Sequence, residues 1–149
     1  MATGIKLEIS DANFREVLNS FRNEVSKRTA LIDAEIAAHG ELMSTSAKQL
    51  APFDTSRLRG SISLKKEGFL QYQLVAQTDY AAYQEFGTGK YALSYVPSLD
   101  EEWQEIATQF RKSKNPDFQG IPPTGFMNRS VKAYTPSLIK AINKVLKSK

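Results

Sequence analysis

The chain has 149 residues, a formal net charge of +4, no cysteine and one histidine, His39. These counts exclude disulfides and the usual cysteine and histidine ligand sets of zinc, and no apolar run approaches the length of a bilayer span. The length fits one domain with one core, which we expect to cover residues 1–149. The first residues lack the basic start and apolar stretch of a signal peptide, so we expect synthesis in a cytoplasm and no membrane partner.

A long amphipathic helix is predicted near the N-terminal end. Ser10 and Asp11 are good N-cap residues, and apolar or small residues then recur at steps of three and four, which marks one helix face. This stripe consists of Phe14, Leu18, Phe21, Val25, Thr29, Ile32, Ile36, His39, Met43, Ala47 and Leu50. At 1.5 Å per residue the helix would be roughly 55–60 Å long. Such a helix extends past any compact body, so its free end needs another surface; the alternative is two shorter helices broken near Gly40.

A β-hairpin is predicted after Pro52, which ends the helix. Residues 61–65 and 70–76 alternate between apolar and polar, and Glu67-Gly68 lies between them. The apolar face of the first run holds Ile62 and Leu64, and that of the second holds Leu70, Tyr72, Leu74 and Ala76. A short helical turn with three aromatic rings is expected next, because of the spacing of Tyr80, Tyr83 and Phe86.

A further helix is predicted from Pro97, because Ser98 and Glu101 have the spacing of a capping box. Its apolar stripe would contain Leu99, Trp103, Ile106 and Phe110. Residues 111–123 contain three prolines and Gly120, which is typical of an exposed loop.

The last predicted helix begins near Thr124 or Phe126. Its apolar residues are Met127, Val131, Tyr134, Leu138, Ile142 and Val145. Their common phase continues past Pro136, so one kinked helix is expected. From Arg129 onward the chain has six basic residues and no acidic one. This segment is either a solvated helix face or a surface for an acidic partner or DNA.

The sequence offers no clear reaction centre. A histidine base would have to be His39, which falls on the apolar stripe of the long helix. Residues 87–90 (Gly-Thr-Gly-Lys) do not have the spacing of a phosphate-binding loop. Nothing in the spacing of Asp54, Asp79 and Glu85 requires them to meet as general acid and base. We therefore assign no catalytic, cofactor-binding or metal-binding residue, and expect that the protein is not an enzyme and has no cofactor.

Two short segments carry a family resemblance. They are residues 51–62 (APFDTSRLRGSI) and residues 79–89 (DYAAYQEFGTG), and residues 121–127 (IPPTGFM) follow at the expected place. In this order, after a long helix and around a hairpin, they resemble the tail-completion, or head–tail connector, proteins of long-tailed bacteriophages. The chain departs from that pattern in two ways. Ser56 stands where the family usually has glycine, and residues 91–120 look like an insertion.

The resemblance implies a structural subunit of the phage head–tail junction, located in the virion and made in the bacterial host cytoplasm. Its copies would form a closed ring, with six as the expected number, and leave a channel for DNA that passes without sequence recognition. The other partners would be connector, adaptor or stopper proteins and the tail tube protein. The implied fold is α+β, a small antiparallel sheet packed against a long N-terminal helix and a C-terminal helix.

Seven residues are candidates for assembly or interface contacts: Arg57, Arg59, Tyr80, Tyr83, Glu85, Phe86 and Trp103. We expect Arg57 or Arg59 to pair with Glu85 or with an acidic residue of a neighbouring subunit, since a guanidinium and a carboxylate form strong hydrogen bonds. Trp103 should help to dock the insertion on its own sheet or on a neighbour. The alternative function is a small nucleic-acid-binding module that uses the basic C-terminal helix, although Tyr134 is the only aromatic residue from Arg129 onward.

Overall fold

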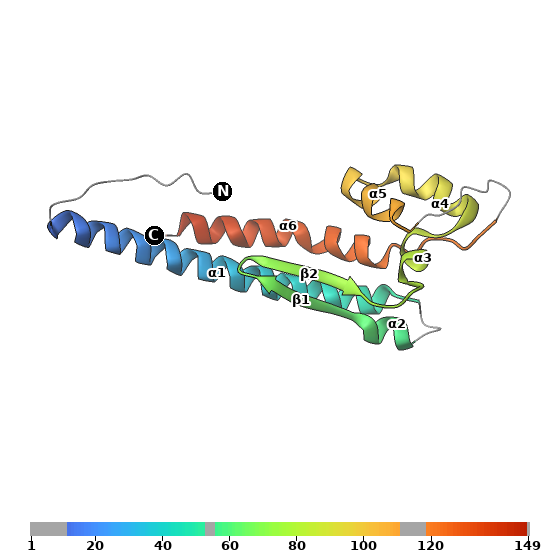
Figure 1. Cartoon of the computed structure of the whole chain (residues 1–149), viewed down its shortest axis with the longest axis horizontal. Coiled ribbons are helices and arrows are strands. Elements are labelled where there is room, and N and C mark those ends of the chain that lie inside the picture. Colours follow the sequence, from blue (N-terminus) through green and yellow to red (C-terminus); the bar gives the residue numbers. More distant parts are fainter. Residues whose placement is uncertain (1–11, 53–55, 111–118, 149) are drawn as a thin grey trace.

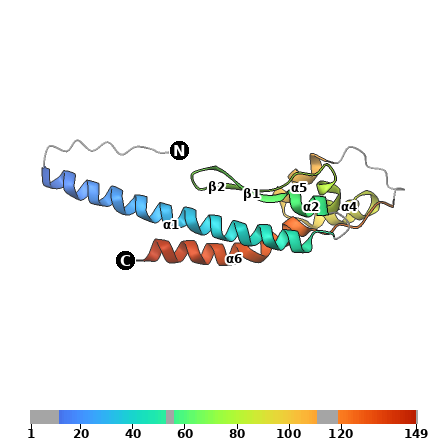
Figure 2. The same ribbon diagram turned by 90° about the horizontal axis from the view of Figure 1, so that it is seen from below.

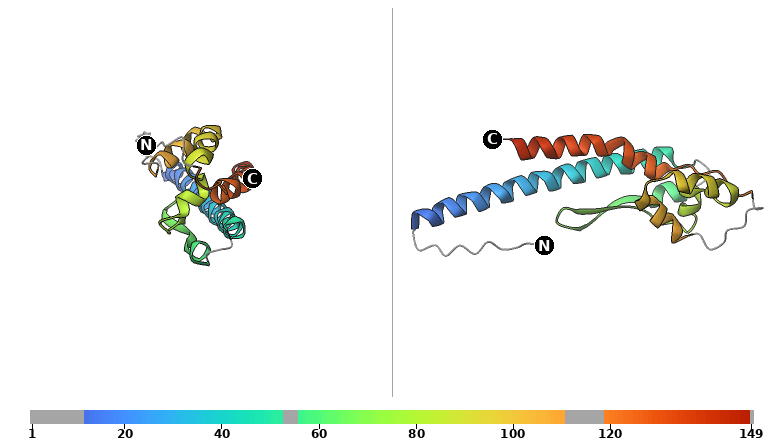
Figure 3. Two further views of the ribbon diagram at one scale, coloured as in Figure 1. Left: turned by 90° about the vertical axis from the view of Figure 1, so that its right-hand side faces the viewer. Right: turned by 90° about the horizontal axis from the view of Figure 1, so that it is seen from above.

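The computed structural model describes residues 12–52, 56–110 and 119–148 and confirms the α+β fold. Its elements, in chain order, are α1 (Ala12–Leu50), α2 (Ser56–Ser61), β1 (Ile62–Gly68), β2 (Gln71–Ala76), α3 (Ala81–Phe86), α4 (Gly89–Tyr95), the 3₁₀ turn η1 (Val96–Ser98), α5 (Glu101–Thr108) and α6 (Phe126–Lys147). The long helices α1 and α6 lie side by side and run in opposite directions, while the β1–β2 hairpin lies along another side of α1 (Figures 1 and 2). Helices α4 and α5 gather beside α3, at the end where α6 begins (Figure 3).

Helix α1 is one continuous helix of 39 residues, so the alternative of a break near Gly40 is wrong. Gly40 is buried against the hairpin, where a Cβ atom would lie 2.7 Å from Leu64 Cδ1. The glycine therefore permits a close approach of β1 to the helix. Its low helix propensity is outweighed by packing, as is common for buried helices.

Helix α6 is continuous through Pro136, as its apolar phase predicted. Its buried side meets α1, and the hydroxyl of Ser130 lies 2.9 Å from Ser46 Oγ and 2.7 Å from Phe126 O. These small residues let the two helix backbones approach closely without leaving a buried hydroxyl unpaired.

The two strands pair antiparallel, with Ile62 opposite Ala76 and Leu64 opposite Leu74. Strand β1 continues to Gly68, past the predicted run, and an irregularity follows Lys66. The prediction that Leu70 belongs to the apolar strand face is wrong. Leu70 lies in the turn with a φ of 62°, an unusual conformation for a branched side chain.

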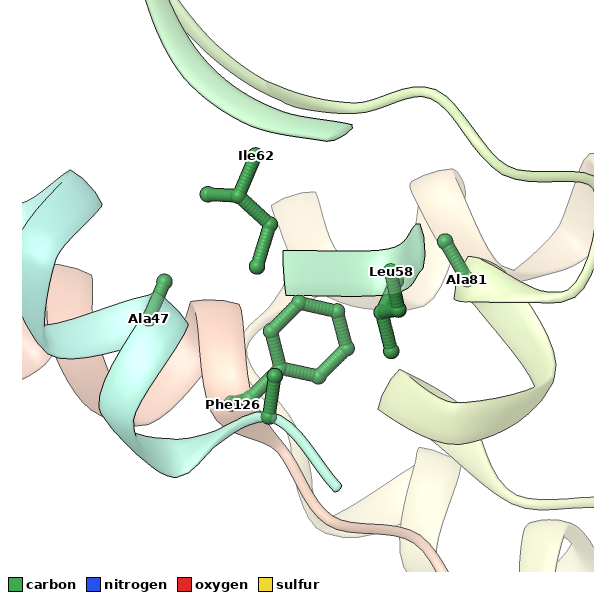
Figure 4. Packing of buried hydrophobic residues seen from close by; sticks show 6 residues of the cluster. Ala47, Leu58, Ile62, Ala81 and Phe126 are labelled. Carbon is green, nitrogen blue, oxygen red and sulfur yellow. The ribbon is translucent and has the colours of Figure 1, made fainter. Parts of the chain in front are cut away.

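Two hydrophobic clusters stabilise the end where α6 begins. The first joins α1, α2, β1, α3 and α6, and its buried residues are Ala47, Ala51, Leu58, Ile62, Ala81 and Phe126 (Figure 4). The second belongs mainly to the predicted insertion, and its buried residues are Phe86, Ala92, Val96, Leu99 and Ala107. The insertion therefore docks on α3 and not on its own sheet.

The local structure of the insertion differs from the prediction in two respects. Helix α4 was not predicted, and the capping box at Ser98 is wrong. Asp100 holds the N-cap position of α5, while the Ser98 hydroxyl donates to Tyr95 O, one turn back in the chain. The 3₁₀ turn at Val96–Ser98 delays the start of the helix and takes Ser98 away from the N-cap position.

Candidate functional site

The carboxylate of Glu85 caps the N-terminal end of α6. Glu85 lies at the end of α3 and is only 2% exposed. Its Oε2 accepts from the Met127 N–H at 2.8 Å, and its Oε1 accepts from the Asn128 N–H at 2.9 Å. A carboxylate at this place satisfies two of the free amides of the first turn and interacts favourably with the helix dipole.

The residues around Glu85 join α3 to the loop that leads into α6. The N–H of Thr88 donates to Ile121 O at 3.0 Å, and the Thr88 hydroxyl accepts from the Ile121 N–H at 2.9 Å. The Thr124 N–H and hydroxyl both donate to Gln84 O, at 2.8 and 2.7 Å. Gly87 has a φ of 74°, and a Cβ atom there would lie 2.9 Å from Ile121 O. The second family-like segment is therefore a clamp that orients α6.

Burial and neighbouring groups in this clamp have opposing effects on the pKa of Glu85. Burial raises the pKa of Glu85, while the two amide hydrogen bonds and the Arg129 guanidinium oppose the rise. Burial also raises the pKa of the Tyr95 phenol, and the nearby Glu85 charge acts in the same direction. Arg129, from the first turn of α6, is thus the basic residue whose charge acts on Glu85.

The expected pairing of Glu85 with Arg57 or Arg59 inside the chain is wrong, because both Glu85 oxygens bind α6 and no ion pair joins these residues in the described part of the chain. Arg59 donates to Ala51 O at 3.1 Å and thereby ties α2 to the end of α1. Arg57 lies on an exposed position of α2. Pairing of either arginine with a neighbouring subunit stays a prediction, and the carboxylate of Asp54 lies outside the described residues.

The aromatic candidates separate into buried and exposed positions. Tyr80 packs against the first cluster, and its buried hydroxyl has no hydrogen-bond partner among the described residues. Phe86 is buried and contacts the half-buried ring of Trp103, with 6.4 Å between the ring centroids and 59° between the planes. Tyr83 is exposed. The three rings are therefore not presented together. Tyr80 packs against the first cluster and Phe86 belongs to the second, while Tyr83 is exposed.

The opposite end of α6 is capped by Arg28, which the sequence analysis did not identify. Its guanidinium donates to Val145 O at 3.2 Å, to Leu146 O at 2.7 Å and to Ser148 O, while Nε donates to Glu24 at 3.0 Å. A cation at the C-terminal end of a helix satisfies free carbonyls and interacts favourably with the dipole. Both ends of α6 are thus fixed by side chains from other elements.

The tip of the hairpin is held to α1 by Asp33, which was also missed. Asp33 accepts from the Leu70 N–H at 2.9 Å, the Tyr72 hydroxyl at 3.0 Å and the Lys66 ammonium at 3.1 Å. The Leu70 amide is the main cause that lowers the pKa of Asp33. The same hydrogen bond holds Leu70 in its left-handed conformation and leaves Phe69 exposed at the tip.

These contacts define an apolar surface that we call the open end. The side of α1 that is buried at Met43 and Ala47 continues to Val25 and Phe21, where α6 and the hairpin have both ended. The exposed apolar residues of the open end are Phe21 (65% exposed), Val25, Phe69 (60%), Leu70 and Leu146 (54%). Helix α1 extends beyond the hairpin tip and beyond the end of α6 (Figure 1).

Comparisons of the chain with known protein families, with curated proteins and with solved structures find no match. Within residues 12–52, 56–110 and 119–148, no helix is long and apolar enough to cross a membrane.

Proposed function

We propose that this chain is a structural subunit of the head–tail junction of a long-tailed bacteriophage, and that its copies join into a closed ring around the DNA channel. The observation that carries the proposal is the open end. Exposed apolar side chains of α1, of the hairpin tip and of the end of α6 lie in this part of the molecule, and exposed apolar surface is typical of protein interfaces.

The rigid attachment of the neighbouring elements supports the same proposal. Asp33 fixes the hairpin tip and Arg28 fixes the end of α6, so Leu70 and Leu146 are held in place before any partner binds. A preorganised surface loses less conformational entropy on association. The family-like segments contribute indirectly, because the Glu85 clamp sets the direction of α6.

A nucleic-acid-binding module is the second candidate. It is favoured by α6, in which Lys132, Lys140, Lys144 and Lys147 are exposed and no acidic residue occurs. Binding that depends on phosphate contacts weakens steeply with salt. Salt-sensitive DNA binding by the monomer, without self-association, would support this module.

A pair of matched variants tests the proposed assembly. Phe21→Ser changes the open end, whereas Leu42→Ser changes an equally apolar, exposed position elsewhere on α1. Native mass spectrometry and electron microscopy of the purified protein and of virions should show rings for the wild type and Leu42→Ser, and their loss for Phe21→Ser. Monomers alone in both settings, for the wild type, would contradict the proposal.

A further inference from the structure

Helix α6 has an outward face that no described element covers. Lys140, Lys144 and Lys147 are spaced four and three residues apart, so they lie on one face, and all three are exposed. None of them has an ion-pair partner in the described part of the chain. Beside them, Ile139 is exposed next to an open hollow of about 340 Å³. This hollow is lined by Pro136, Ser137, Ile139, Lys140 and Asn143.

The insertion presents a surface of the opposite charge. Trp103, Ile106 and Ala107 turn one side of α5 toward the second cluster. The opposite side carries Glu101, Glu102 and Glu105, all exposed and, among the described residues, without a cationic partner. Between residues 91 and 110 the chain has four acidic residues and no basic one. Phe110, which follows α5, adds an exposed aromatic ring.

No ion pair joins the α5 glutamates to Lys140, Lys144 or Lys147 within the described part of one chain. Asp100 lies 3.6 Å from Lys132, which places the start of α5 beside the second turn of α6. Lys140 lies about 12 Å and Lys147 about 22 Å further along α6. The lysine face therefore lies further along α6 than the place where α5 begins.

The spacing of the two surfaces is matched. Glu101 and Glu105 are four residues apart on α5, as Lys140 and Lys144 are on α6. Each pair is separated by about 6 Å along its helix. Two helices in contact can therefore form both ion pairs at once, while an exposed ring such as Phe110 has the hollow beside Pro136 and Ile139 close by.

We infer that the outward face of α6 binds the α5 helix of a second copy of this chain, so that α5, within the insertion, serves as the contact element between subunits. The inference rests on the proposed function and adds a second contact between subunits to the one at the open end. Because the two surfaces differ and are displaced along the molecule, the contact is heterologous, the type that closes into a ring.

Charge reversal with rescue tests the inference on the full chain. One variant carries Lys140→Glu and Lys144→Glu, a second carries Glu101→Lys and Glu105→Lys, and a third combines all four changes. Lys48→Glu with Lys65→Glu is the control, since it makes the same change in net charge at exposed positions of α1 and β1. Sedimentation is measured in about 50 mM and about 500 mM salt, since screening weakens exposed ion pairs.

Each reversal alone should weaken self-association at low salt by roughly tenfold or more, because like charges then face each other. The variant that combines all four substitutions and the control variant should both associate like the wild type. Circular dichroism checks that α6 remains helical in each variant.

Three outcomes overturn the inference. Rings that form equally well in both single-surface variants would show that the interface lies elsewhere, while the proposed function stands. A wild type that stays monomeric at low salt would exclude this contact, and the proposed function would then depend on the virion images alone. Loss of DNA binding without loss of self-association in the lysine variant would assign the α6 face to DNA instead.

Discussion

Replacement of Glu85 by Ala is the sharpest test of the clamp at the start of α6. The substitution removes both acceptors of the Met127 and Asn128 amides at a position only 2% exposed. Hydrogen bonds to a charged group contribute roughly 1.5–3 kcal/mol each, and the cost of burying the carboxylate offsets part of this gain. We therefore expect the free energy of unfolding to fall by about 2–4 kcal/mol.

Urea unfolding followed by circular dichroism measures this loss. The control is Glu41→Ala, which changes an exposed carboxylate on α1 and should stay within about 0.5 kcal/mol of the wild type. If Glu85→Ala were as stable as the control, the capping role of Glu85 would be refuted.

The titration of Glu85 gives an independent check. Burial raises its pKa above the ordinary value of 4.5, so the folded chain holds the proton more tightly than the unfolded chain. The part of the stability that depends on this proton is therefore full below about pH 4.5 and is lost as the pH rises through the raised pKa of the folded state, while the two amide hydrogen bonds to the carboxylate remain. In Glu85→Gln this pH dependence should disappear. The wild type should thus lose stability relative to Glu85→Gln between pH 4 and pH 8, and a constant difference would contradict the direction of the shift.

Three further substitutions test other parts of the account. Gly87→Ala should destabilise the fold by about 2 kcal/mol or more, because its φ is positive and its new Cβ would collide with the backbone at Ile121 O. Gly60→Ala is the control, since open space surrounds Gly60, and it should be neutral or stabilising by up to about 1 kcal/mol. The midpoints of urea unfolding distinguish the two results. Trp103→Ala should cost about 2–4 kcal/mol and reduce the near-ultraviolet circular dichroism signal, and an unchanged thermal midpoint would show that the second cluster does not depend on this ring. Arg28→Ala should lower the free energy of unfolding by about 1 kcal/mol and increase amide exchange in the last turn of α6, while unchanged exchange there would contradict the cap.

Periodicity predicted the long elements well. The three-and-four spacing in α1 and the common phase on both sides of Pro136 in α6 both correspond to continuous helices, because each has one side buried against the rest of the chain. The hairpin was predicted from the alternation of apolar and polar residues along its two strands. Local signals were less reliable at Ser98, where a 3₁₀ turn moved the helix start by two residues.

The partners of the charged residues could not be predicted from the sequence. Glu85 binds backbone amides about 40 positions away, and Arg28 binds carbonyls almost 120 positions away. Backbone groups carry no sequence signature, so a search for a partner among the side chains led to Arg57 and Arg59. The backbone groups at the two ends of α6 were the missing partners. A predicted helix end that has no capping residue nearby in the sequence could have indicated that a distant side chain caps it.

An image of the assembled chain tests the central claim most directly. Electron microscopy of the purified protein and of the virion neck, with native mass spectrometry, should show closed rings of six copies, or about 100 kDa for a chain of 16.7 kDa. Averages of the neck should place α1 and the hairpin tip at the contact with the next subunit or layer. A chain that is monomeric in solution and absent from the neck of the virion would contradict the account.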